Sequence, residues 1–374
     1  MDNETLTLDT ETRDLFAASV ARYGQDKYSF EHYRRLLKAA PRFGVQAWKD
    51  YADMGWLAAA LPVDQGGFAS DPAVVASLMT YAGEHLALEP LFANLVLCAP
   101  LLAWCAEAPG VQERLQALSS GRRLFALAHA ENLADAMNGA VAAQFSHGAI
   151  TGHKRVVLHG DVADELVVTA VAAGGTGEEH MLLCAVDVMQ PGVRKTSYKL
   201  VDGRGAASFE FDHAVATVLA GPGAAAAMVQ RTLEDACMAL CAEAYGAMRA
   251  LNRLTLAYLK DRRQFGRPIG TNQALQHRMV ELYMLQQESS AVIEAAHRAS
   301  GLVPSQRQCA IMGAAAHVIA AARQISHEAV QMHGGMGLTD ELAVSHYFKR
   351  IMVVSRLLGD RDAHLDAFAT AGAT

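Results

Sequence analysis

The spacing of apolar residues changes twice along this chain of 374 residues. In its first third, apolar side chains recur mostly every three or four positions, as from Ser29 to Leu57 and from Asp71 to about Trp104. Asp71 and Pro72 form a typical helix start, with a capping carboxylate followed by a first-turn proline. Proline and glycine at 62–67 predict a turn between the two helical segments. We therefore predict an N-terminal helical domain over residues 1–120.

Short apolar runs replace this pattern from about Arg123. Each run is bounded by glycine or charged residues and has the length of a strand. A glycine-rich segment at 174–177 is typical of a loop between two of them. The predicted strands lie at 124–128, 165–169, 181–186 and 208–211. These runs indicate a small β domain over residues 121–217.

Helical spacing returns at about Ala224 and continues for some thirty residues through Val229, Leu240 and Tyr258. Two more helical patterns follow, at 272–300 and 306–332. Long helices without internal breaks suit a bundle in which each helix packs on several others. We predict a C-terminal four-helix bundle over residues 218–374, and an α+β chain overall: helical domain, small β domain, helical bundle.

Composition narrows the class of protein. Hydrophobic residues make up 52% and charged residues 19%, which favours a packed globular protein over a disordered one. No apolar run approaches the length of a membrane span, so no membrane insertion is expected. The acidic first residues lack the features of a signal peptide. A net charge of −7 argues against nucleic acid as the main partner.

The six cysteines, all in apolar surroundings, form no C-x-x-C pair. Cys237 and Cys241 are four residues apart on a helical pattern, which could offer two metal ligands, but no second pair has suitable spacing. We expect free thiols, no metal, and a reduced, cytoplasmic protein.

Two segments of the C-terminal part suggest a site for a dinucleotide cofactor. The first runs from Arg262 through Phe265 and a Pro-Ile-Gly turn to Gln273, and the second comprises Gln331 and the pair Gly334-Gly335. A pyrophosphate needs charge neutralisation and directional donors, which arginine and glycine backbone supply. Each segment also has a simpler explanation: arginine complements a helix C-terminus, and glycine pairs end helices. Their joint occurrence favours the cofactor site.

These segments resemble the FAD-binding signature of acyl-CoA dehydrogenases, and the likeness extends over nearly the whole chain. Residues 51–57 with 61–67 resemble that family's first helical domain, and residues 202–211 resemble the exit from its β domain. The resemblance implies that Arg262, Phe265, Gln273, Gln331, Gly334 and Gly335 contact the adenine and pyrophosphate of an FAD. It also implies that this FAD is held chiefly by a neighbouring subunit within a tetramer. Substrate and electron acceptor would be an acyl-CoA and an electron-transfer flavoprotein.

The catalytic base implied by the family is missing. Its position in the final loop holds Leu358, and the alternative position on the long helix holds Ala236; neither side chain can take a proton. Nearby carboxylates are Glu234, Asp235, Glu243 and Asp360. Glu243 interrupts an alanine-rich stretch and is a weak candidate base, but a carboxylate paired with a buried arginine or at a subunit contact is slightly favoured. Asp360 resembles a solvated helix start. No catalytic residue is assigned.

The segments that cover the flavin ring in the family also differ here. Residues 129–132 keep only Glu131 of a Thr-Glu-Pro-like strand end, and residues 156–160 lack the family's tryptophan. His159 could donate to a flavin, although a lone histidine in a turn is more often solvated. The chain thus lacks the ring-side residues but keeps the two FAD-binding segments at 262–273 and 331–335. In this it resembles the small, β-type subunits of heteromeric acyl-CoA dehydrogenases, such as the pimeloyl-CoA dehydrogenase small subunit and the paired enzymes of steroid side-chain degradation.

The resemblance therefore predicts an FAD-dependent acyl-CoA dehydrogenase that carries out α,β-dehydrogenation, with this chain completing a partner's FAD site. A self-sufficient homotetramer with a non-standard base is one alternative, and a non-catalytic scaffold subunit is another. A flavin monooxygenase on the same fold also stays open. The sequence names no acyl group, and it does not decide between a homomeric and a heteromeric assembly.

Overall fold

The computed structural model describes residues 8–68, 71–132 and 141–372. The chain divides into two compact units. The sheet unit takes the described residues within 1–18, 35–75 and 88–236, and the bundle unit takes 19–34, 76–87 and those within 237–374. Several helices contribute residues to both units, among them α7. The predicted boundaries at 120 and 217 stay a prediction.

The N-terminal third is helical, as predicted, but its helices are shorter than the apolar pattern suggested. The predicted segments 29–57 and 71–104 are each interrupted, the second at Leu86, whose φ of +57° ends an α-helix, and at Pro90. The start at Asp71 is confirmed, because its Oδ1 accepts a hydrogen bond from the Ala73 N–H at 2.9 Å. The helices are α1 (Thr10–Lys27), α2 (Phe30–Leu36), α3 (Val45–Asp53), α4 (Pro72–His85), the π-helical η3 (Phe92–Cys98), α5 (Ala99–Trp104) and α6 (Val111–Ser119).

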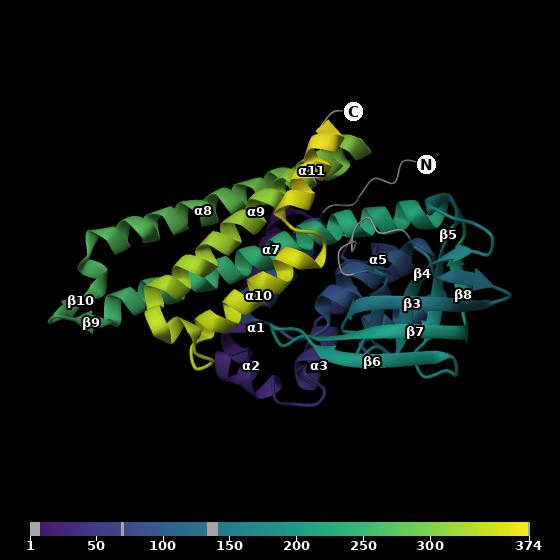
Figure 1. Ribbon diagram of the computed structural model, residues 1–374, viewed down its shortest axis with the longest axis horizontal. Coiled ribbons are helices and arrows are strands. Elements are labelled where there is room, and N and C mark those ends of the chain that lie inside the picture. Colours follow the sequence, from purple (N-terminus) through teal and green to yellow (C-terminus); the bar gives the residue numbers. More distant parts are fainter. Residues whose placement is uncertain (1–7, 69–70, 133–140, 373–374) are drawn as a thin grey trace. The chain divides into compact units, whose positions relative to one another are not determined.

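The β-strands of the sheet unit form one mixed sheet with the order β6-β7-β3-β2-β4-β5-β8, in which β1 also pairs with β4 (Figure 1). Pairs β1–β4 and β2–β4 are parallel, and the others are antiparallel. Buried side chains, most of them alanine, valine, leucine and phenylalanine of the strands themselves, form the core of this sheet. The strands are β1 (Phe125–Ala128), β2 (Gln144–Ser146), β3 (Ala149–Leu158), β4 (Glu165–Ala172), β5 (Met181–Asp187), β6 (Val193–Lys199), β7 (Gly205–Val215) and β8 (Thr217–Ala220).

All four predicted strands are present, as β1, β4, β5 and β7. Strands β2, β3, β6 and β8 were not predicted. β6 is mostly exposed and polar, so it carries no apolar alternation that a sequence pattern would show. In β3, register shifts lie between Ile150 and Gly152 and between Lys154 and Val157, and each shift interrupts the period of two.

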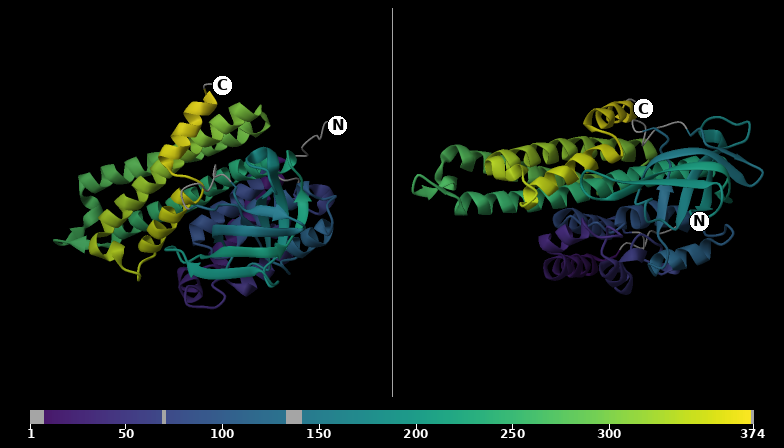
Figure 2. Two further views of the ribbon diagram at one scale, coloured as in Figure 1. Left: turned by 45° about the vertical axis from the view of Figure 1, so that its right-hand side comes forward. Right: turned by 60° about the horizontal axis from the view of Figure 1, so that its bottom comes forward.

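The bundle unit is built from long helices that lie side by side (Figures 1 and 2). The three predicted helical patterns are confirmed within two or three residues of their expected ends. These helices are α7 (Ala224–Asp261), α8 (Gln273–Arg298), α9 (Pro304–His333), α10 (Ala343–Leu357) and α11 (Arg361–Gly372). A small hairpin of β9 (Arg263–Gln264) and β10 (Arg267–Pro268) joins α7 to α8.

Close approach of two helix backbones characterises the contact of α4 with α7. A Cβ built on Gly83 would lie 1.8 Å from the Glu243 carbonyl oxygen, and one on Gly246 would lie 2.0 Å from the Thr80 carbonyl oxygen. Only glycine allows backbones to meet at this distance. The two glycines therefore set the spacing of these helices inside the bundle unit.

One helical stretch, Pro304–Leu338, is long and apolar enough to cross a membrane by length and composition alone. The sequence expectation that no apolar run reaches such a length is therefore wrong for this stretch. Its apolar window is 61% buried, and α9 packs against α8, α10 and α11, as the central helix of a bundle does.

Candidate functional site

The two predicted FAD-binding segments meet within the bundle unit. Tyr258, one turn before Arg262 on α7, stacks on His333, the last residue of α9, with ring centroids 4.3 Å apart. The Tyr258 hydroxyl also donates to the His333 carbonyl oxygen at 3.4 Å. Because Gly334 and Gly335 follow His333 directly, the arginine segment and the glycine segment lie at the same end of the bundle.

Residues 262–272 join α7 to α8, and we call this segment together with Gln273 the FAD-binding arm. It forms a tight turn whose backbone contacts the end of α7. The Ile269 N–H donates to the Arg262 carbonyl oxygen at 2.8 Å, and a Cβ on Gly270 would lie 2.8 Å from the Leu259 carbonyl oxygen. Phe265 and Gly266, with φ of +51° and +81°, form the tip of the β9–β10 hairpin. A type I′ turn requires a positive φ at both central residues. The turn holds Phe265 fully exposed, at 101% of its reference area.

The predicted contact residues are accessible to a ligand. Arg262, Gln273, Gln331, Gly334 and Gly335 are all exposed. Gln273 opens α8, so free backbone N–H groups of a helix N-terminus lie beside its side chain. A Cβ at Gly334 or Gly335 would meet nothing within 4 Å, which leaves their backbone open to close approach. An exposed arginine, open glycine backbone and a helix N-terminus together fit the pyrophosphate of FAD.

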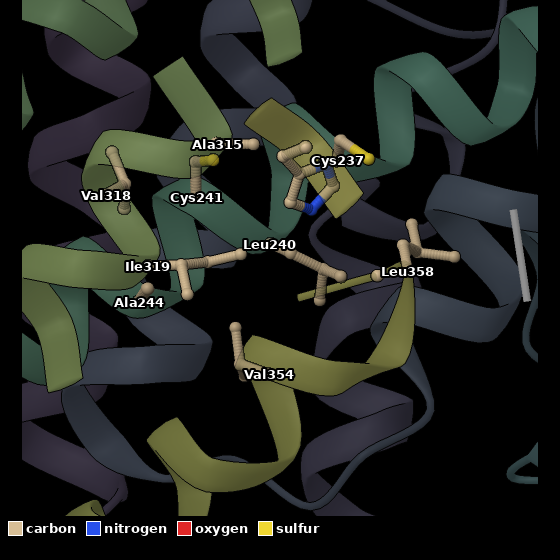
Figure 3. Close-up of a pocket in the computed structure, with 11 residues that line it drawn as sticks. Cys237, Leu240, Cys241, Ala244, Ala315, Val318, Ile319, Val354 and Leu358 are labelled. Atoms are coloured by element: carbon tan, nitrogen blue, oxygen red, sulfur yellow. The ribbon is translucent and has the colours of Figure 1, made fainter. Parts of the chain in front are cut away.

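Leu358, at the position where the family has its catalytic base, borders an apolar cavity. Leu358 lines a cavity of about 10 Å³, together with Cys237, the residue after the fully buried Ala236. In Figure 3 the side chains of Leu240, Ile319 and Val354 point into the same space. The remaining lining residues are Cys241, Ala244, Ala315, Val318, Gly359 and His364, so within the described part of the chain no carboxylate lines this cavity.

His364 is the cavity's one imidazole. It is 3% exposed, and its Nδ1 lies 3.4 Å from the Met312 sulfur. Burial lowers the pKa of His364, against the opposing charge of Asp360. In the same cavity, burial raises the pKa of the Cys241 thiol to about 12, so this cysteine stays protonated at neutral pH. These groups are packed into the core of the bundle unit.

Glu243 is held by an arginine, as the favoured alternative predicted. Arg350 Nη1 lies 3.0 Å from Glu243 Oε1, and each side chain is 1% exposed. Arg350 also donates from Nη2 to the carbonyl oxygens of Leu86 and Ala87. Sequence reasoning left the arginine partner of Glu243 unnamed, and the structure identifies it as Arg350.

The other carboxylates near the base positions have local partners. Asp360 caps α11, because its Oδ1 accepts from the Ala363 N–H at 3.1 Å, and this hydrogen bond lowers its pKa. Asp235 pairs with Arg231 one turn away at 2.9 Å. Glu234 is buried and accepts from Gln230 at 3.3 Å. The predicted helix start at Asp360 is thus confirmed.

In the sheet unit, the segment expected near a flavin ring forms its hydrogen bonds with other residues of the same unit. Lys154 is fully buried, and its ammonium donates to Glu131 Oε1 at 2.7 Å, to the His129 carbonyl oxygen and to Thr169 Oγ1. Glu131 also accepts from the N–H groups of Ala142 and Ala143 at 3.0 Å. Burial lowers the pKa of Lys154 to about 8, although Glu131 acts in the opposite direction.

The histidines of this region are buried. His129 donates to or accepts from Thr169 Oγ1 at 3.0 Å, and burial, followed by the charge of Lys154, lowers its pKa to about 4. His159 has a φ of +56° and is 4% exposed, so the expectation that it is solvated is wrong. Its backbone N–H donates to the Gly205 carbonyl oxygen at 2.9 Å. Among the described residues, no cluster of three metal-binding side chains is present.

Comparison with known proteins finds a matching family model and a relative that covers nearly the whole chain. Residues 223–372 match the family model for the acyl-CoA dehydrogenase C-terminal domain. The acyl-CoA dehydrogenase IpdE2 of Mycolicibacterium smegmatis is 26% identical over 351 residues, which cover 94% of this chain and 95% of that protein.

Two solved structures share the fold. A variant of the Tcur3481–Tcur3483 steroid ACAD superposes with a TM-score of 0.85 at 26% identity, covering 97% of this chain and 98% of that one. The ChsE4–ChsE5 complex from Mycobacterium tuberculosis superposes with the same TM-score of 0.85 at 24% identity, covering 98% of each chain.

The fold and the match define a flavin-dependent oxidoreductase that acts on CH–CH groups. The chain has the acyl-CoA dehydrogenase fold, and its residues 223–372 match the C-terminal domain of the acyl-CoA dehydrogenase family. The predicted fold class, enzyme class and cofactor, FAD, are thereby confirmed. The predicted FAD contacts, the absence of a base and the cytoplasmic location stay predictions.

Proposed function

We propose that this chain is one subunit of a heteromeric acyl-CoA dehydrogenase, in which it completes the FAD site of a partner subunit and supplies no catalytic base of its own. One observation carries the proposal: Leu358, at the family's base position, lines an apolar cavity that no carboxylate of the described residues lines. Glu243, the candidate base on α7, is held by Arg350. α,β-Dehydrogenation needs a base for the α proton.

The exposed arm supports the second half of the proposal. Arg262 would pair with the pyrophosphate, while Gln273 and the backbone of Gly334 and Gly335 would bind near the adenosine. When bound, FAD accepts the hydride that leaves Cβ of the acyl-CoA. Glu131, the carboxylate of the segment expected near the flavin ring, accepts hydrogen bonds from Lys154 and from two backbone N–H groups, and this leaves it little capacity to bind a flavin.

The names of the two solved structures each join two chains, Tcur3481 with Tcur3483 and ChsE4 with ChsE5. This supports a heteromeric assembly. An acyl-CoA as substrate, an electron-transfer flavoprotein as acceptor and a small subunit of the pimeloyl-CoA or steroid type are parts of the same proposal. A cytoplasmic location is part of the same proposal.

A homotetramer with its own base is the second candidate, and Glu243 is its carboxylate. The visible absorption spectrum of the chain purified alone separates the two, because it gives FAD per chain. We expect little or no flavin in the isolated chain. A value near one FAD per chain would contradict the proposal and favour complete sites in a homo-oligomer.

Arg262→Ala tests the assigned role of the arm. In the complex with its partner, we expect this change to lower FAD occupancy at least about tenfold at limiting FAD, because a charge-assisted hydrogen bond to phosphate is lost. Flavin absorbance per complex measures it. Arg298→Ala is the matched control, since this exposed arginine pairs with Glu294 at the far end of α8. Unchanged occupancy in Arg262→Ala would refute the role of this arginine.

A further inference from the structure

The segment that joins α9 to α10 carries two of the predicted FAD contacts, Gly334 and Gly335, and we call its residues 334–342 the glycine loop. Both glycines are exposed, and a Cβ on either one would meet nothing within 4 Å. Since no neighbouring atom crowds this open backbone, its position depends on the contacts that the rest of the loop makes. Those contacts lie at the two ends of the loop.

The first end of the glycine loop is anchored on α9. Residues 334–338 form the 3-10 helix η7, in which Gly337 is buried. A Cβ on Gly337 would lie 2.8 Å from the Val330 carbonyl oxygen and 3.0 Å from His333 Cβ. The loop therefore turns back against the last turn of α9, at a distance that only glycine allows. The stacking of Tyr258 on His333 fixes the same end.

The second end of the glycine loop is anchored on α10 through Asp340. His346 Nε2 lies 3.1 Å from the Asp340 carbonyl oxygen, and Lys349 Nζ donates to Asp340 Oδ1 at 2.6 Å. A carbonyl oxygen only accepts, so Nε2 carries a proton and donates. His346 and Lys349 are three positions apart and share a face of α10. Two side chains of one helix thus hold the backbone and the side chain of one loop residue.

The imidazole of His346 is held in place by two aromatic residues of α2, which lie in the same bundle unit. The Tyr33 hydroxyl is 3.3 Å from Nδ1, and the ring centroids of Tyr33 and Phe30 each lie 5.3 Å from that of His346. His346 is 5% exposed, and this burial lowers its pKa. The ring is therefore neutral at pH 7, with its one N–H at Nε2 and with Nδ1 free to accept from the Tyr33 hydroxyl.

His346 differs from a histidine that only satisfies its own helix. In α9, His333 Nδ1 lies 2.7 Å from the Ala329 carbonyl oxygen one turn back, so that contact stays within one helix. The donor of His346 instead reaches a carbonyl oxygen of the loop that precedes α10. This contact therefore ties the loop to the helix.

Anchoring at Asp340 is passed on to the glycines through η7. Asp340 follows Gly335 by five positions, which is about 10 Å at the rise of a 3-10 helix. The Thr339 N–H donates to the Met336 carbonyl oxygen at 3.2 Å, so hydrogen bonds continue from η7 to the residue before Asp340. Because this short segment is hydrogen-bonded along its length, a displacement of Asp340 would also displace the backbone that FAD approaches.

We propose that His346 is a positioning residue for the cofactor: by donating to the Asp340 carbonyl oxygen, it fixes the glycine loop in the conformation that presents Gly334 and Gly335 to FAD. His346 acts through the loop and takes no part in the chemistry. The inference rests on the proposed function for its ligand, because it takes the bound group to be the FAD shared with a partner subunit. The anchoring itself is a property of this chain alone.

Hydrogen–deuterium exchange of the isolated chain tests the anchoring without FAD or a partner. We expect His346→Leu to raise the exchange rate of the backbone amides at 334–342 at least about fivefold, because the loop loses a hydrogen bond and opens more often. Lys349→Met, at a position that is 31% exposed, should raise this rate about threefold and decides the matter if His346→Leu does not fold. Wild-type exchange rates in the folded variants would overturn the anchoring.

Two further variants separate the hydrogen bond from the loss of a buried ring. His364→Leu is the matched control, since His364 on α11 is 3% exposed and its Nδ1 contacts the Met312 sulfur, not the glycine loop. It should leave exchange at 334–342 at the wild-type rate. His346→Gln keeps an amide N–H that can replace the Nε2 donor, so its rate should stay within about twofold of the wild type. Equally fast exchange in His346→Gln and His346→Leu would overturn the role of the hydrogen bond.

The affinity for FAD tests the positioning. The tagged chain is co-expressed with an acyl-CoA dehydrogenase subunit of the same genome that carries the family's base, each such subunit tried in turn, and the Kd for FAD of the purified complex is measured by flavin fluorescence. We expect a Kd about tenfold higher in His346→Leu, and wild-type values within about twofold in His346→Gln and His364→Leu. A wild-type Kd in His346→Leu, despite faster exchange of the loop, would overturn the positioning role.

Failure of this inference and failure of the proposed function give different results. If the wild-type complex binds FAD and His346→Leu binds it equally well, only the role of His346 fails. If the wild-type chain assembles with no partner and alone carries about one FAD per chain, the proposed function fails. A Kd for FAD about tenfold higher in His346→Leu of that homo-oligomer would then still support the positioning role, and an unchanged Kd would overturn it as well.

Discussion

The Glu243–Arg350 pair shows at the scale of single residues why a lone glutamate in an apolar stretch is ambiguous. The sequence pattern indicated burial, and both a catalytic and a structural role followed from it. Arg350 lies 107 residues away, and only the packing of α10 against α7 decides between the roles. The ion pair with Arg350 therefore predicts a structural role for Glu243.

We expect Glu243→Gln to destabilise the chain by about 3 kcal/mol or more, because it leaves the Arg350 charge buried without a counter-charge. Urea denaturation of the wild type and variant measures the free energy of unfolding. Asp235→Asn is a control, because Asp235 forms an exposed pair with Arg231 on the same helix and should change stability by less than about 1 kcal/mol. Unchanged stability with lost turnover in Glu243→Gln would instead support a catalytic role.

His129 provides a pH-dependent contribution to stability. Burial lowers its pKa from 6.5 to about 4, so the unfolded chain binds more protons than the folded chain between these values. Stability from this group is therefore fully present above pH 6.5 and is lost as the pH falls towards 4, by up to about 3 kcal/mol. His129→Gln should flatten the loss of unfolding free energy between pH 6.5 and 4.5. His153→Gln, at an exposed position of β3, should leave the wild-type slope. Equal slopes in all three proteins would contradict this role.

At the scale of elements, long amphipathic helices were predictable and the irregular sheet was not. The helices α7, α8 and α9 bury one face continuously, so the pattern of apolar residues persists over many turns. Strand β6 is edge-like and exposed, and β3 is broken by register shifts, so each lacks the alternation that sequence reasoning needs. Breaks within the N-terminal helices depend on single residues such as Leu86, whose positive φ no apolar pattern reveals.

The contact of α4 with α7 depends on glycine at two positions. We expect Gly246→Ala to destabilise the chain by about 2 kcal/mol or more, because the new methyl group would meet the Thr80 carbonyl oxygen at 2.0 Å and force the helices apart. Thermal unfolding measures the change in Tm. Gly301→Ala is the matched control, since a Cβ there meets nothing within 4 Å and its backbone needs no positive φ. Equal Tm values for the two variants would contradict the close approach.

At the scale of the whole molecule, the family resemblance predicted more than the residue patterns could. Residue periodicity gave the order of helical, β and helical segments, and the two short motifs suggested a dinucleotide site. That Arg262 and Gly334 lie at the same end of the bundle follows from the stacking of Tyr258 on His333, which joins residues 75 positions apart.

The hairpin that holds Phe265 has a consequence for how the cell must make this protein. Phe265 is exposed over its whole surface, and its tight turn keeps the ring from packing against the rest of the chain. Chaperones and proteases recognise exposed apolar side chains of this kind on subunits that are not assembled. If a second subunit covers it, unassembled copies should be short-lived and complexed copies stable. Matched synthesis of the two chains would then be needed, and the amount of one would set the abundance of the other.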